Sequence, residues 1–400
     1  MIGNIKNEIN LGIVALGLKN GGRARITSLL INYLSNYKLF HIYLFSKKSK
    51  EKDEYKIPQN TKRILINNFM NNNIFKEIKK KQLDILIYQL SNYTEIDSLN
   101  KLKNLKIIFY IHQSIFYWIY YNYLDFKNLY KLYHNSKYLI NLIPLENNYL
   151  FKKWGIKSIL MTNFIVFEYN FTIPSNLSSK IILMVGRGAD KFKRFKLGIQ
   201  SMEFIKQEII ECNMKIISDI NNIYFLKYIT ENLDLESNIE FVGYTKYPEK
   251  HFKDASLHIF PSLSESFGLT LSETKMYGIP NILLGLDYLS ISRGGTIIIY
   301  DDTAESISKE SLKILLNDRI KNNLGKEARR NIKQFNNNHL LRIEYETRIS
   351  KKYLLKILKN QIILLNKRNL FYINITINNI KNFIFLENTI SKKNCKFYLK

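Results

Sequence analysis

The sequence predicts an α/β protein built from two doubly wound domains, in each of which helices wrap a parallel sheet. Apolar runs short enough for buried strands alternate with helical patterns along most of the chain. These runs form two sets, divided near residues 164–178 by a stretch that contains Pro174 and several Asn and Ser residues. Residues 256–280 display the repeating unit, in which a buried strand, a short loop and a helix follow one another.

The predicted strands lie on either side of this division. In the first set they cover residues 10–16, 40–45, 63–66, 84–88, 106–111, 138–142 and 158–162. In the second set they cover residues 180–185, 214–218, 238–242, 256–260, 281–284 and 296–299. We therefore expect a first domain at 1–165, a second at 166–337 and a helix at 338–359. Residues 360–400 form a basic extension, which is either a membrane-surface or partner element or a poorly ordered tail.

Composition and cysteine content narrow the class of protein. The 400 residues include only two cysteines, Cys212 and Cys395, which excludes a disulfide framework and a multi-cysteine metal site. This usage suits the reducing cytoplasm. The uncharged run at 107–124 contains polar side chains and five tyrosines, and it reads as a strand and an aromatic helix more readily than as a membrane span. Residues 9–18 read as a buried strand and not as a signal peptide.

The charge of the chain is unevenly distributed. The formal net charge is +26 overall, but residues 1–150 carry 22 Lys and Arg against 10 Asp and Glu. Residues 201–300 carry 8 against 13, and residues 351–400 carry 11 against 1. Basic regions attract anionic membrane, nucleic acid or phosphorylated acceptors, and an ordinary solvated lysine surface is the alternative. No nucleic-acid-binding motif is present, so we expect no nucleic-acid partner.

Two carboxylates flank the turn between the strand at 256–260 and the helix that follows it. Glu265 lies in the loop, and Glu273 lies in a helix predicted from about Gly268 to Tyr277, with Gly278 just past its end. Side chains lean toward a helix N-terminus, so Glu273 can reach back toward the pocket that Glu265 faces. Carboxylates accept hydrogen bonds from sugar or ribose hydroxyls. The alternative for Glu273 is a solvent-facing position on a surface helix.

Backbone amides of the same turn form a predicted phosphate site. The start of a helix beyond the carboxyl end of a parallel strand favours an anion, because its N–H groups lack partners within the helix. The amides concerned belong to Ser266, Phe267, Gly268 and Leu269.

Three further stretches carry polar or glycine residues directly after predicted strands. Gly21 and Gly22 precede a helix expected to begin near Ile26, and they either approach a ligand or form a plain tight turn. His112 follows the strand at 106–111 and is either functional or structural. Gly243 and Tyr244 follow the strand at 238–242.

A cluster of cations follows the first strand of the second set. Arg187 lies between two glycines, and Lys193 precedes the next helix. A guanidinium can bind two phosphate oxygens at once and a lysine adds a compact charge, so these residues form a plausible diphosphate clamp. Lys191 or Arg194 could take the place of Lys193, and an exposed basic loop is the alternative.

These motifs together resemble those of the retaining glycosyltransferases of family 4, also called group 1. The E-x7-E pattern of Glu265 and Glu273 with its internal Phe-Gly, the Gly-Arg and Lys of residues 186–193, the paired glycines and His112 all match in position. The stretches 285–289 and 293–295 resemble a lipopolysaccharide-type subgroup. The resemblance implies the GT-B fold, in which two Rossmann-like domains face each other across a cleft, and a helix at 338–359 that crosses back to the first domain.

The resemblance also implies an activity and a set of roles. The enzyme would move a hexosyl unit from a nucleotide-diphosphate sugar, with a UDP-sugar as the expected donor, to a hydroxyl of a glycan or lipid-linked acceptor. Glu265, His112, Arg187 and Lys193 would serve catalysis. Glu273 and the glycine-rich, Ser266–Leu269 and Gly243–Tyr244 segments would bind the donor. Neither a metal nor another cofactor is expected, and the protein would be cytoplasmic, with peripheral contact to the inner face of an anionic membrane.

Other functions remain open at this level. A phosphorylase or a sugar-nucleotide epimerase could use the same architecture. A catalytically degenerate scaffold that binds membrane or nucleic acid through its basic regions is the alternative outside enzymes. The sequence does not identify the donor base, the donor sugar or the acceptor.

Overall fold

The computed structural model describes residues 8–19, 21–47, 54–66, 73–89, 102, 105–115, 130, 133–134, 138–163, 172–188, 191–219, 223–245, 247–333 and 335. By its contacts the chain divides into two compact units, Met1–Glu346 and Thr347–Lys400. Every described residue lies in the first unit. The predicted helix at 338–359 and the extension at 360–400 lie outside the described residues, and so does much of the aromatic run at 107–124.

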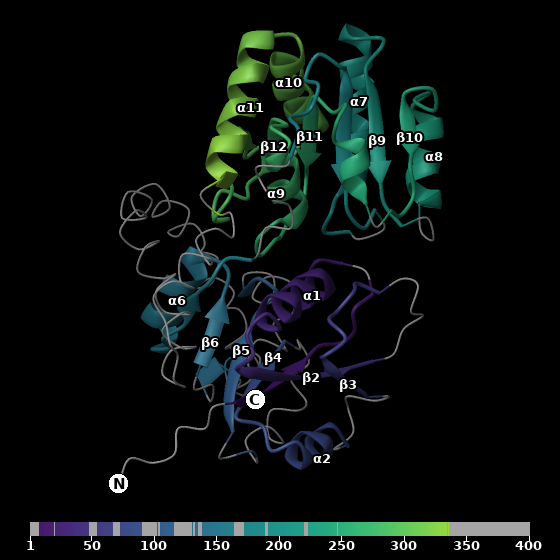
Figure 1. The fold of residues 1–400 in the computed structure, drawn as a ribbon. Coiled ribbons are helices and arrows are strands. Elements are labelled where there is room, and N and C mark those ends of the chain that lie inside the picture. The colour runs from purple at the N-terminus through teal and green to yellow at the C-terminus, as the bar shows by residue number, and fades with distance from the viewer. Residues whose placement is uncertain are drawn as a thin grey trace, which may run out of the picture. The chain divides into compact units, whose positions relative to one another are not determined.

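The first part of this unit is a seven-stranded parallel sheet with the order β3-β2-β1-β4-β5-β6-β7 (Figure 1). Its strands are β1 (Ile9–Val14), β2 (Phe40–Ser46), β3 (Lys62–Leu65), β4 (Ile85–Tyr88), β5 (Lys106–Tyr110), β6 (Tyr138–Asn141) and β7 (Ile159–Leu160). The described helices that accompany them are α1 (Gly22–Leu34), α2 (Asn73–Lys80) and α6 (Pro144–Trp154).

The second part is a six-stranded parallel sheet with the order β10-β9-β8-β11-β12-β13. Its strands are β8 (Ile181–Val185), β9 (Asn213–Ile217), β10 (Ile239–Phe241), β11 (Leu257–Phe260), β12 (Asn281–Leu284) and β13 (Thr296–Ile299). The helices are α7 (Phe195–Glu208), α8 (Tyr224–Asn232), α9 (Leu269–Met276), α10 (Ala304–Leu315) and α11 (Asp318–Lys333), with a short 3-10 helix, η5 (Pro248–His251).

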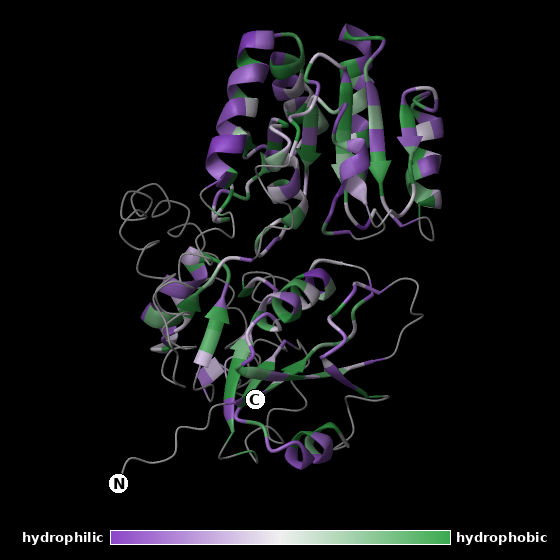
Figure 2. Ribbon diagram, in the orientation of Figure 1, coloured by the Kyte–Doolittle hydropathy of each residue, from purple (hydrophilic) through white to green (hydrophobic). Residues whose placement is uncertain are grey.

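Five of the strands are largely apolar on both faces. Strands β4, β6, β8, β11 and β12 are buried along nearly their whole length, as expected for parallel strands that helices cover on both sides. Figure 2 shows the strands as largely hydrophobic, whereas α2 and α11 are largely hydrophilic. Helix α11 buries only the stripe Lys321, Gly325, Ala328 and Ile332, and it packs against α9 and α10.

Both strand orders reverse at a central point, between β1 and β4 in the first sheet and between β8 and β11 in the second. In open parallel sheets the loops at the carboxyl ends of such a pair diverge and leave room for a ligand. The segments predicted to bind phosphate and sugar follow three of these four strands. The topology therefore brings them to the ligand-binding edges of the sheets.

The predicted fold class is confirmed, and each predicted strand is present within two residues of its expected bounds. One boundary differs from the prediction, because α1 begins at Gly22 and not near Ile26. The predicted domain boundaries stay predictions. Within the described ranges, no helix is both long and apolar enough to cross a membrane.

Candidate active site

The turn between β11 and α9 is shaped by residues at both of its ends. Gly268 forms the N-cap of α9 with φ 82°, and a Cβ there would lie 3.3 Å from Leu271 Cβ. The buried side chain of Phe267 anchors the loop. At the other end, Gly278 N–H donates to Lys275 O at 3.0 Å and Ile279 N–H donates to Thr274 O at 3.1 Å. These two hydrogen bonds end the helix where the sequence predicted its end.

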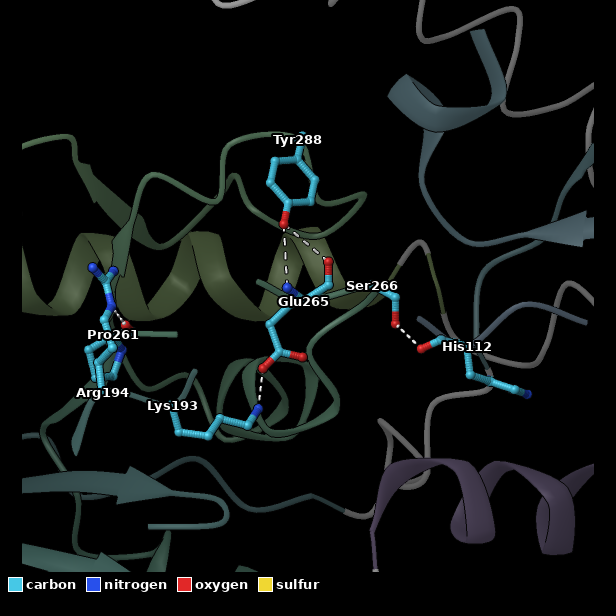
Figure 3. A network of polar contacts seen from close by, with 7 residues as sticks. All are labelled: His112, Lys193, Arg194, Pro261, Glu265, Ser266 and Tyr288. Carbon is cyan, nitrogen blue, oxygen red and sulfur yellow. Dashed lines mark hydrogen bonds and ion pairs between the residues drawn. The ribbon is translucent and has the colours of Figure 1, made fainter. Parts of the chain in front are cut away.

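Glu265 and Lys193 form an ion pair beside this turn (Figure 3). The two side chains are largely buried, with 15% and 19% of their surface exposed. Lys193 Nζ also lies 5.5 Å from the centre of the Phe260 ring. The structure thus brings together the predicted sugar-contacting carboxylate and one of the two predicted phosphate-binding cations. Each compensates the charge of the other.

The backbone of Glu265 is held by Tyr288, which lies in the stretch 285–289 and to which the sequence assigned no role. The phenol hydroxyl donates to Glu265 O at 3.2 Å and accepts from Glu265 N–H at 3.3 Å (Figure 3). Burial raises the pKa of Tyr288, so the phenol stays protonated at neutral pH. The resemblance of 285–289 did not predict this role, because it depends on a contact between residues 23 positions apart.

The loop before α7 lies against the loop after β11. Leu263 N–H donates to Phe192 O at 2.7 Å, and Arg194 Nε donates to Pro261 O at 2.7 Å. Arg194 also pairs with Asp302 at 2.7 Å, so its charge is engaged away from Glu265. These contacts favour Lys193 over Arg194 as the cation directed at the predicted donor site.

Arg187 follows β8 in a loop tied to the end of β9. Gly186 N–H donates to Ile217 O at 3.0 Å, and Gly188 N–H donates to Ser218 Oγ at 2.6 Å. The loop is therefore fixed on both sides of Arg187, which itself is exposed. This position, at the switch point of the second sheet, suits a residue that meets a ligand from solvent.

Glu273 meets a residue from the other sheet. Its Oε1 lies 2.5 Å from Arg25 Nη1, and only 1% of its side chain is exposed. Burial raises the pKa of Glu273, while the Arg25 charge acts in the opposite direction. The solvent-facing alternative for Glu273 is therefore wrong. The pairs Lys193–Glu265 and Arg25–Glu273 give the two glutamates separate partners.

The glycine-rich segment contacts the start of α9. Gly21 forms the N-cap of α1 with φ 91°, so Gly22, Arg23 and Arg25 belong to the first turn of the helix. A Cβ on Gly22 would lie 2.9 Å from Leu269 Cδ1. The first turns of α1 and α9 therefore approach each other closely, and a larger residue at Gly22 would force Leu269 to move.

His112 faces the E-x7-E loop through its backbone. Ser266 Oγ donates to His112 O at 2.7 Å, and Figure 3 shows the imidazole pointing away from Glu265. The ring lies against Tyr110, with 4.1 Å between ring centres. Burial, with a smaller effect of the Arg23 charge, lowers the pKa of His112 to about 3. The imidazole is therefore neutral at physiological pH.

The predicted Gly243–Tyr244 segment is linked to Arg25 and Glu273 through the electrostatics of Tyr55. Gly243 has φ 83° and Tyr244 is exposed. The pKa of Tyr55 is raised to about 12, mainly by burial. The Arg25 charge opposes this rise, and Tyr244 and Glu273 add to it. Tyr55 is therefore within electrostatic range of all three. Arg25 and Tyr55 were missed by sequence reasoning, and the two arginines that follow Gly22 are the only signal that could have indicated Arg25.

Comparisons with known proteins bear on the family and the fold of the chain. Residues 167–331 match the family model described as "Glycosyl transferases group 1". This segment is a group 1 glycosyltransferase domain. Over 115 residues the chain is 25% identical to an uncharacterized glycosyltransferase of Haemophilus influenzae. That match spans 28% of this chain and about a third of the relative, 32% of its length.

Solved glycosyltransferase structures share the fold of the whole described unit. Sucrose-phosphate synthase from Thermosynechococcus elongatus superposes with a TM-score of 0.70 at 16% identity, over 84% of this chain and 98% of that one. A glycosyltransferase from Rickettsia africae gives 0.64 at 18%, over 88% and 100%. The Anabaena protein HepE in complex with UDP and glucose gives 0.68 at 10%, over 85% and 100%. The predicted GT-B fold is confirmed, whereas family 4 and the lipopolysaccharide-type subgroup stay predictions.

The described residues contain no group of three or more His, Cys, Asp or Glu side chains that could hold a metal ion. Asp302 pairs with Arg194, and Asp301 accepts from Ser306 Oγ at 2.7 Å. The roles assigned to the site residues, and the expectation of catalysis without a metal, remain predictions.

Proposed function

We propose that the protein is a retaining glycosyltransferase that moves a hexosyl unit from a UDP-sugar to a hydroxyl of a glycan or lipid-linked acceptor. Such a reaction would belong to the assembly of cell-surface polysaccharide or lipopolysaccharide. The group 1 domain and the GT-B fold support glycosyl transfer. The donor, the retention of configuration and the acceptor class are proposals that extend this assignment.

The observation that carries the proposal is the Lys193–Glu265 pair at the N-terminal end of α9. A cation for a phosphate and a carboxylate for sugar hydroxyls stand side by side at the switch point of the second sheet. The backbone at each residue is held by a neighbouring loop: Leu263 N–H donates to the oxygen of Phe192, and the Tyr288 hydroxyl bonds the N–H and the oxygen of Glu265. The pair would part as donor binds, Lys193 turning to the diphosphate and Glu265 to the sugar.

The leaving group defines the chemistry that these residues must perform. Cleavage of the sugar–phosphate bond places negative charge on the diphosphate. Fixed donors that face the developing charge stabilise the transition state more than the ground state. In the proposal these donors are the amides of Ser266–Leu269, the guanidinium of Arg187 and the ammonium of Lys193. These donors would stabilise the negative charge without a metal, so transfer would persist in the presence of EDTA.

Retention of configuration needs either two displacements or attack on the face from which the diphosphate departs. A double displacement needs a carboxylate nucleophile on the opposite face of the sugar. Glu265 is paired with Lys193, the proposed diphosphate-binding cation, and Glu273 is paired with Arg25. We therefore favour front-face attack by the acceptor hydroxyl. Proton NMR of the first product formed would show an anomeric configuration equal to that of the donor, and an inverted product would overturn this part of the proposal.

A thermal-shift panel tests the function. Wild type, Arg187→Ala and the control Arg319→Ala, which changes an exposed arginine of α11, would be heated with UDP, GDP, ADP and their sugars. We expect one nucleotide family to raise the Tm of wild type and the control, and to have little effect on Arg187→Ala. The variants should have equal Tm values without ligand. Normal transfer by Arg187→Ala would contradict the assignment of Arg187, and no shift with any nucleotide would contradict the function.

The proposed location is the cytoplasmic face of a membrane, held peripherally. Support comes from the excess of Lys and Arg in residues 1–150 and 351–400. Flotation with vesicles containing anionic lipid, but not with neutral vesicles, is the expected result. Binding to both kinds or to neither would remove this part of the proposal.

A further inference from the structure

Lys275 is a fully buried lysine in the last turn of α9, and the proposed chemistry does not use it. Its Nζ donates to the backbone oxygens of Ile291 at 2.5 Å and Arg293 at 2.6 Å. It also donates to Asn331 Oδ1 of α11 at 3.4 Å. The two backbone oxygens belong to the β12–β13 loop, residues 285–295. One ammonium group therefore joins α9 to α11 and to the end of this loop.

The charge of Lys275 has no counter-ion within the part of the chain that the structure describes, because its three partners are uncharged. The charged side chains nearby in α9, in α11 and in the β12–β13 loop have other partners or are exposed: Glu273, Asp287, Arg293, Glu327, Arg329 and Arg330. Burial alone lowers the pKa of Lys275 to about 7. A buried charge without a counter-ion weakens the folded state, so stability does not explain this lysine.

The β12–β13 loop also carries Tyr288, whose hydroxyl bonds the N–H and the oxygen of Glu265 (Figure 3). The next hydroxyl along the loop has a partner in the first half of the chain, because Ser290 Oγ donates to Leu142 O at 3.2 Å. The place of the loop therefore affects the place of Glu265.

Hydrogen bonds within the loop connect Tyr288 to the oxygens that Lys275 binds. Ser292 lies between those two oxygens in sequence. Its N–H donates to Leu289 O at 3.1 Å, and its Oγ donates to Asp287 O at 2.8 Å. These two bonds close the segment around Tyr288, so a shift at the end of the loop is passed on to the tyrosine.

We propose that Lys275 is a positioning residue for glycosyl transfer: it fixes the end of the β12–β13 loop, and the loop fixes Glu265 through Tyr288. This assignment rests on the proposed function, in which Glu265 contacts the transferred sugar. Hydrogen bonds from an ionised donor are about twice as strong as neutral ones. The hold on the loop therefore depends on the proton of Lys275.

The pH should act in opposite directions on activity and on stability. Above about pH 7 the folded protein loses the proton of Lys275, whereas the unfolded chain keeps it until near the ordinary pKa of 10.5. A group with a lower pKa in the folded state stabilises fully above the unfolded pKa, and this effect is lost as pH falls through the folded pKa. The contribution of Lys275 to stability should thus rise from pH 7 to 10, while kcat/KM falls.

Hydrogen exchange tests the contact without an assay of activity. Lys275→Met removes the donor and keeps a side chain of similar length. At pH 6, peptides from 285–293 and 263–267 should exchange about tenfold faster than in wild type, as expected for the loss of a hydrogen bond to a charged group. Peptides from β4 and β5 should be unchanged. Unchanged exchange at 263–267 would overturn the proposal.

Lys321→Met is the matched control. Lys321 is also a buried lysine, but its Nζ pairs with Asp318 of the same helix at 2.8 Å. Its substitution should leave exchange at 285–293 and 263–267 as in wild type. Faster exchange at 263–267 in both variants would show a general effect of losing a buried lysine, and it would overturn the specific role of Lys275.

Kinetics separate a positioning role from a structural one. At pH 6, Lys275→Met should lower kcat/KM about tenfold, because small displacements of a catalytic group are costly. Combined with Tyr288→Phe it should lose no more than the larger single loss, since both act on Glu265 by one route. The ratio of wild-type to Lys275→Met kcat/KM should shrink above pH 7, and the ratio for Lys321→Met should stay near one. Multiplicative losses, or a ratio for Lys275→Met that is constant with pH, would overturn the proposal.

The wild type decides if Lys275→Met does not fold. Exchange at 263–267, corrected for the intrinsic effect of pH, should be faster at pH 8.5 than at pH 6, and no increase would overturn the proposal. The proposed function can fail separately. If the exchange results are as expected and no nucleotide sugar supports transfer, the contact stands and the function is wrong. If transfer occurs and exchange at 263–267 does not change, the function stands and the role of Lys275 is wrong.

Discussion

Arg25 of α1 and Glu273 of α9 form an ion pair of 2.5 Å between residues 248 positions apart in the chain. The carboxylate is 1% exposed and the guanidinium side chain 14%. Glu273 is the second glutamate of the E-x7-E motif. The resemblance implies that this glutamate binds hydroxyls of the donor. A ribose or sugar hydroxyl that reaches Glu273 must therefore share the carboxylate with Arg25 or displace it.

The first prediction is that Arg25→Met strongly destabilises the protein. Removing the cation leaves a buried carboxylate without compensation, which costs about 3–5 kcal/mol in comparable pairs. The pKa of Glu273 is already raised by burial, and it rises further without Arg25. A group whose pKa is higher in the folded than in the unfolded state loses its stabilising effect as pH rises. Denaturant unfolding should therefore show a larger loss at pH 8 than at pH 5.

A double substitution controls for the loss of packing. Glu273→Gln should remove the need for the cation, so Arg25→Met combined with Glu273→Gln should be more stable than Arg25→Met alone. Arg319→Met, on the exposed face of α11, should change the unfolding free energy by less than about 0.5 kcal/mol. If the losses of unfolding free energy in the two single variants simply add in the double variant, Arg25 and Glu273 are not energetically coupled.

The second prediction separates two lysines close together in sequence. Lys193→Met should lower kcat/KM by about 100- to 1000-fold, as does the loss of a fixed donor to a developing negative charge. Lys196→Met lies three residues away at an exposed position of α7 and should leave kcat/KM unchanged. A similar loss in both variants would point to the general charge of this region and away from a specific contact of Lys193.

The strand pattern was predictable because it depends on local sequence. A strand buried on both faces must be apolar throughout, and residues 182–185 and 282–284 satisfy this condition without reference to any other segment. Glu265, Arg187 and His112 were identifiable for the same reason. Each follows directly after an apolar run, so the sequence alone places it at the carboxyl end of a strand.

The partners of these residues were not predictable, because they come from distant segments. Nothing near Glu273 indicates Arg25, and nothing near His112 indicates that its carbonyl accepts from Ser266. The start of α1 was misplaced for a related reason. A glycine pair resembles a loop in isolation, but α1 begins at Gly22, where the absence of a side chain lets Leu269 of α9 approach.

The third prediction concerns acid stability. His258 in β11 is fully buried, and its Nδ1 lies 2.7 Å from Asn281 Oδ1. Burial lowers the pKa of His258 to about 4; the Asn281 bond opposes this effect and the Lys193 charge adds to it. The unfolded chain takes up a proton near pH 6.5, whereas the folded protein does not until about pH 4. Stability should therefore fall as pH decreases through this window.

The expected slope is about 1.4 kcal/mol per pH unit from this one histidine. His258→Gln should flatten the curve of unfolding free energy against pH between 6.5 and 4 by this amount. His41→Gln, at a position 44% exposed, should leave the slope as in wild type. A slope that is unchanged in His258→Gln would mean that the histidine is protonated in the folded protein.

The fourth prediction is that Tyr288→Phe impairs catalysis more than stability. The hydroxyl is bonded to both the N–H and the oxygen of the Glu265 peptide, and its loss frees the segment that carries the carboxylate. We expect kcat/KM to fall about tenfold, since small displacements of a catalytic group are costly. The free energy of unfolding should change by only about 1 kcal/mol.

Tyr300→Phe removes an exposed hydroxyl, which donates to Asp287 at 3.2 Å, and serves as the matched control. Full activity in Tyr288→Phe would show that Glu265 is positioned by Lys193 and the start of α9 alone.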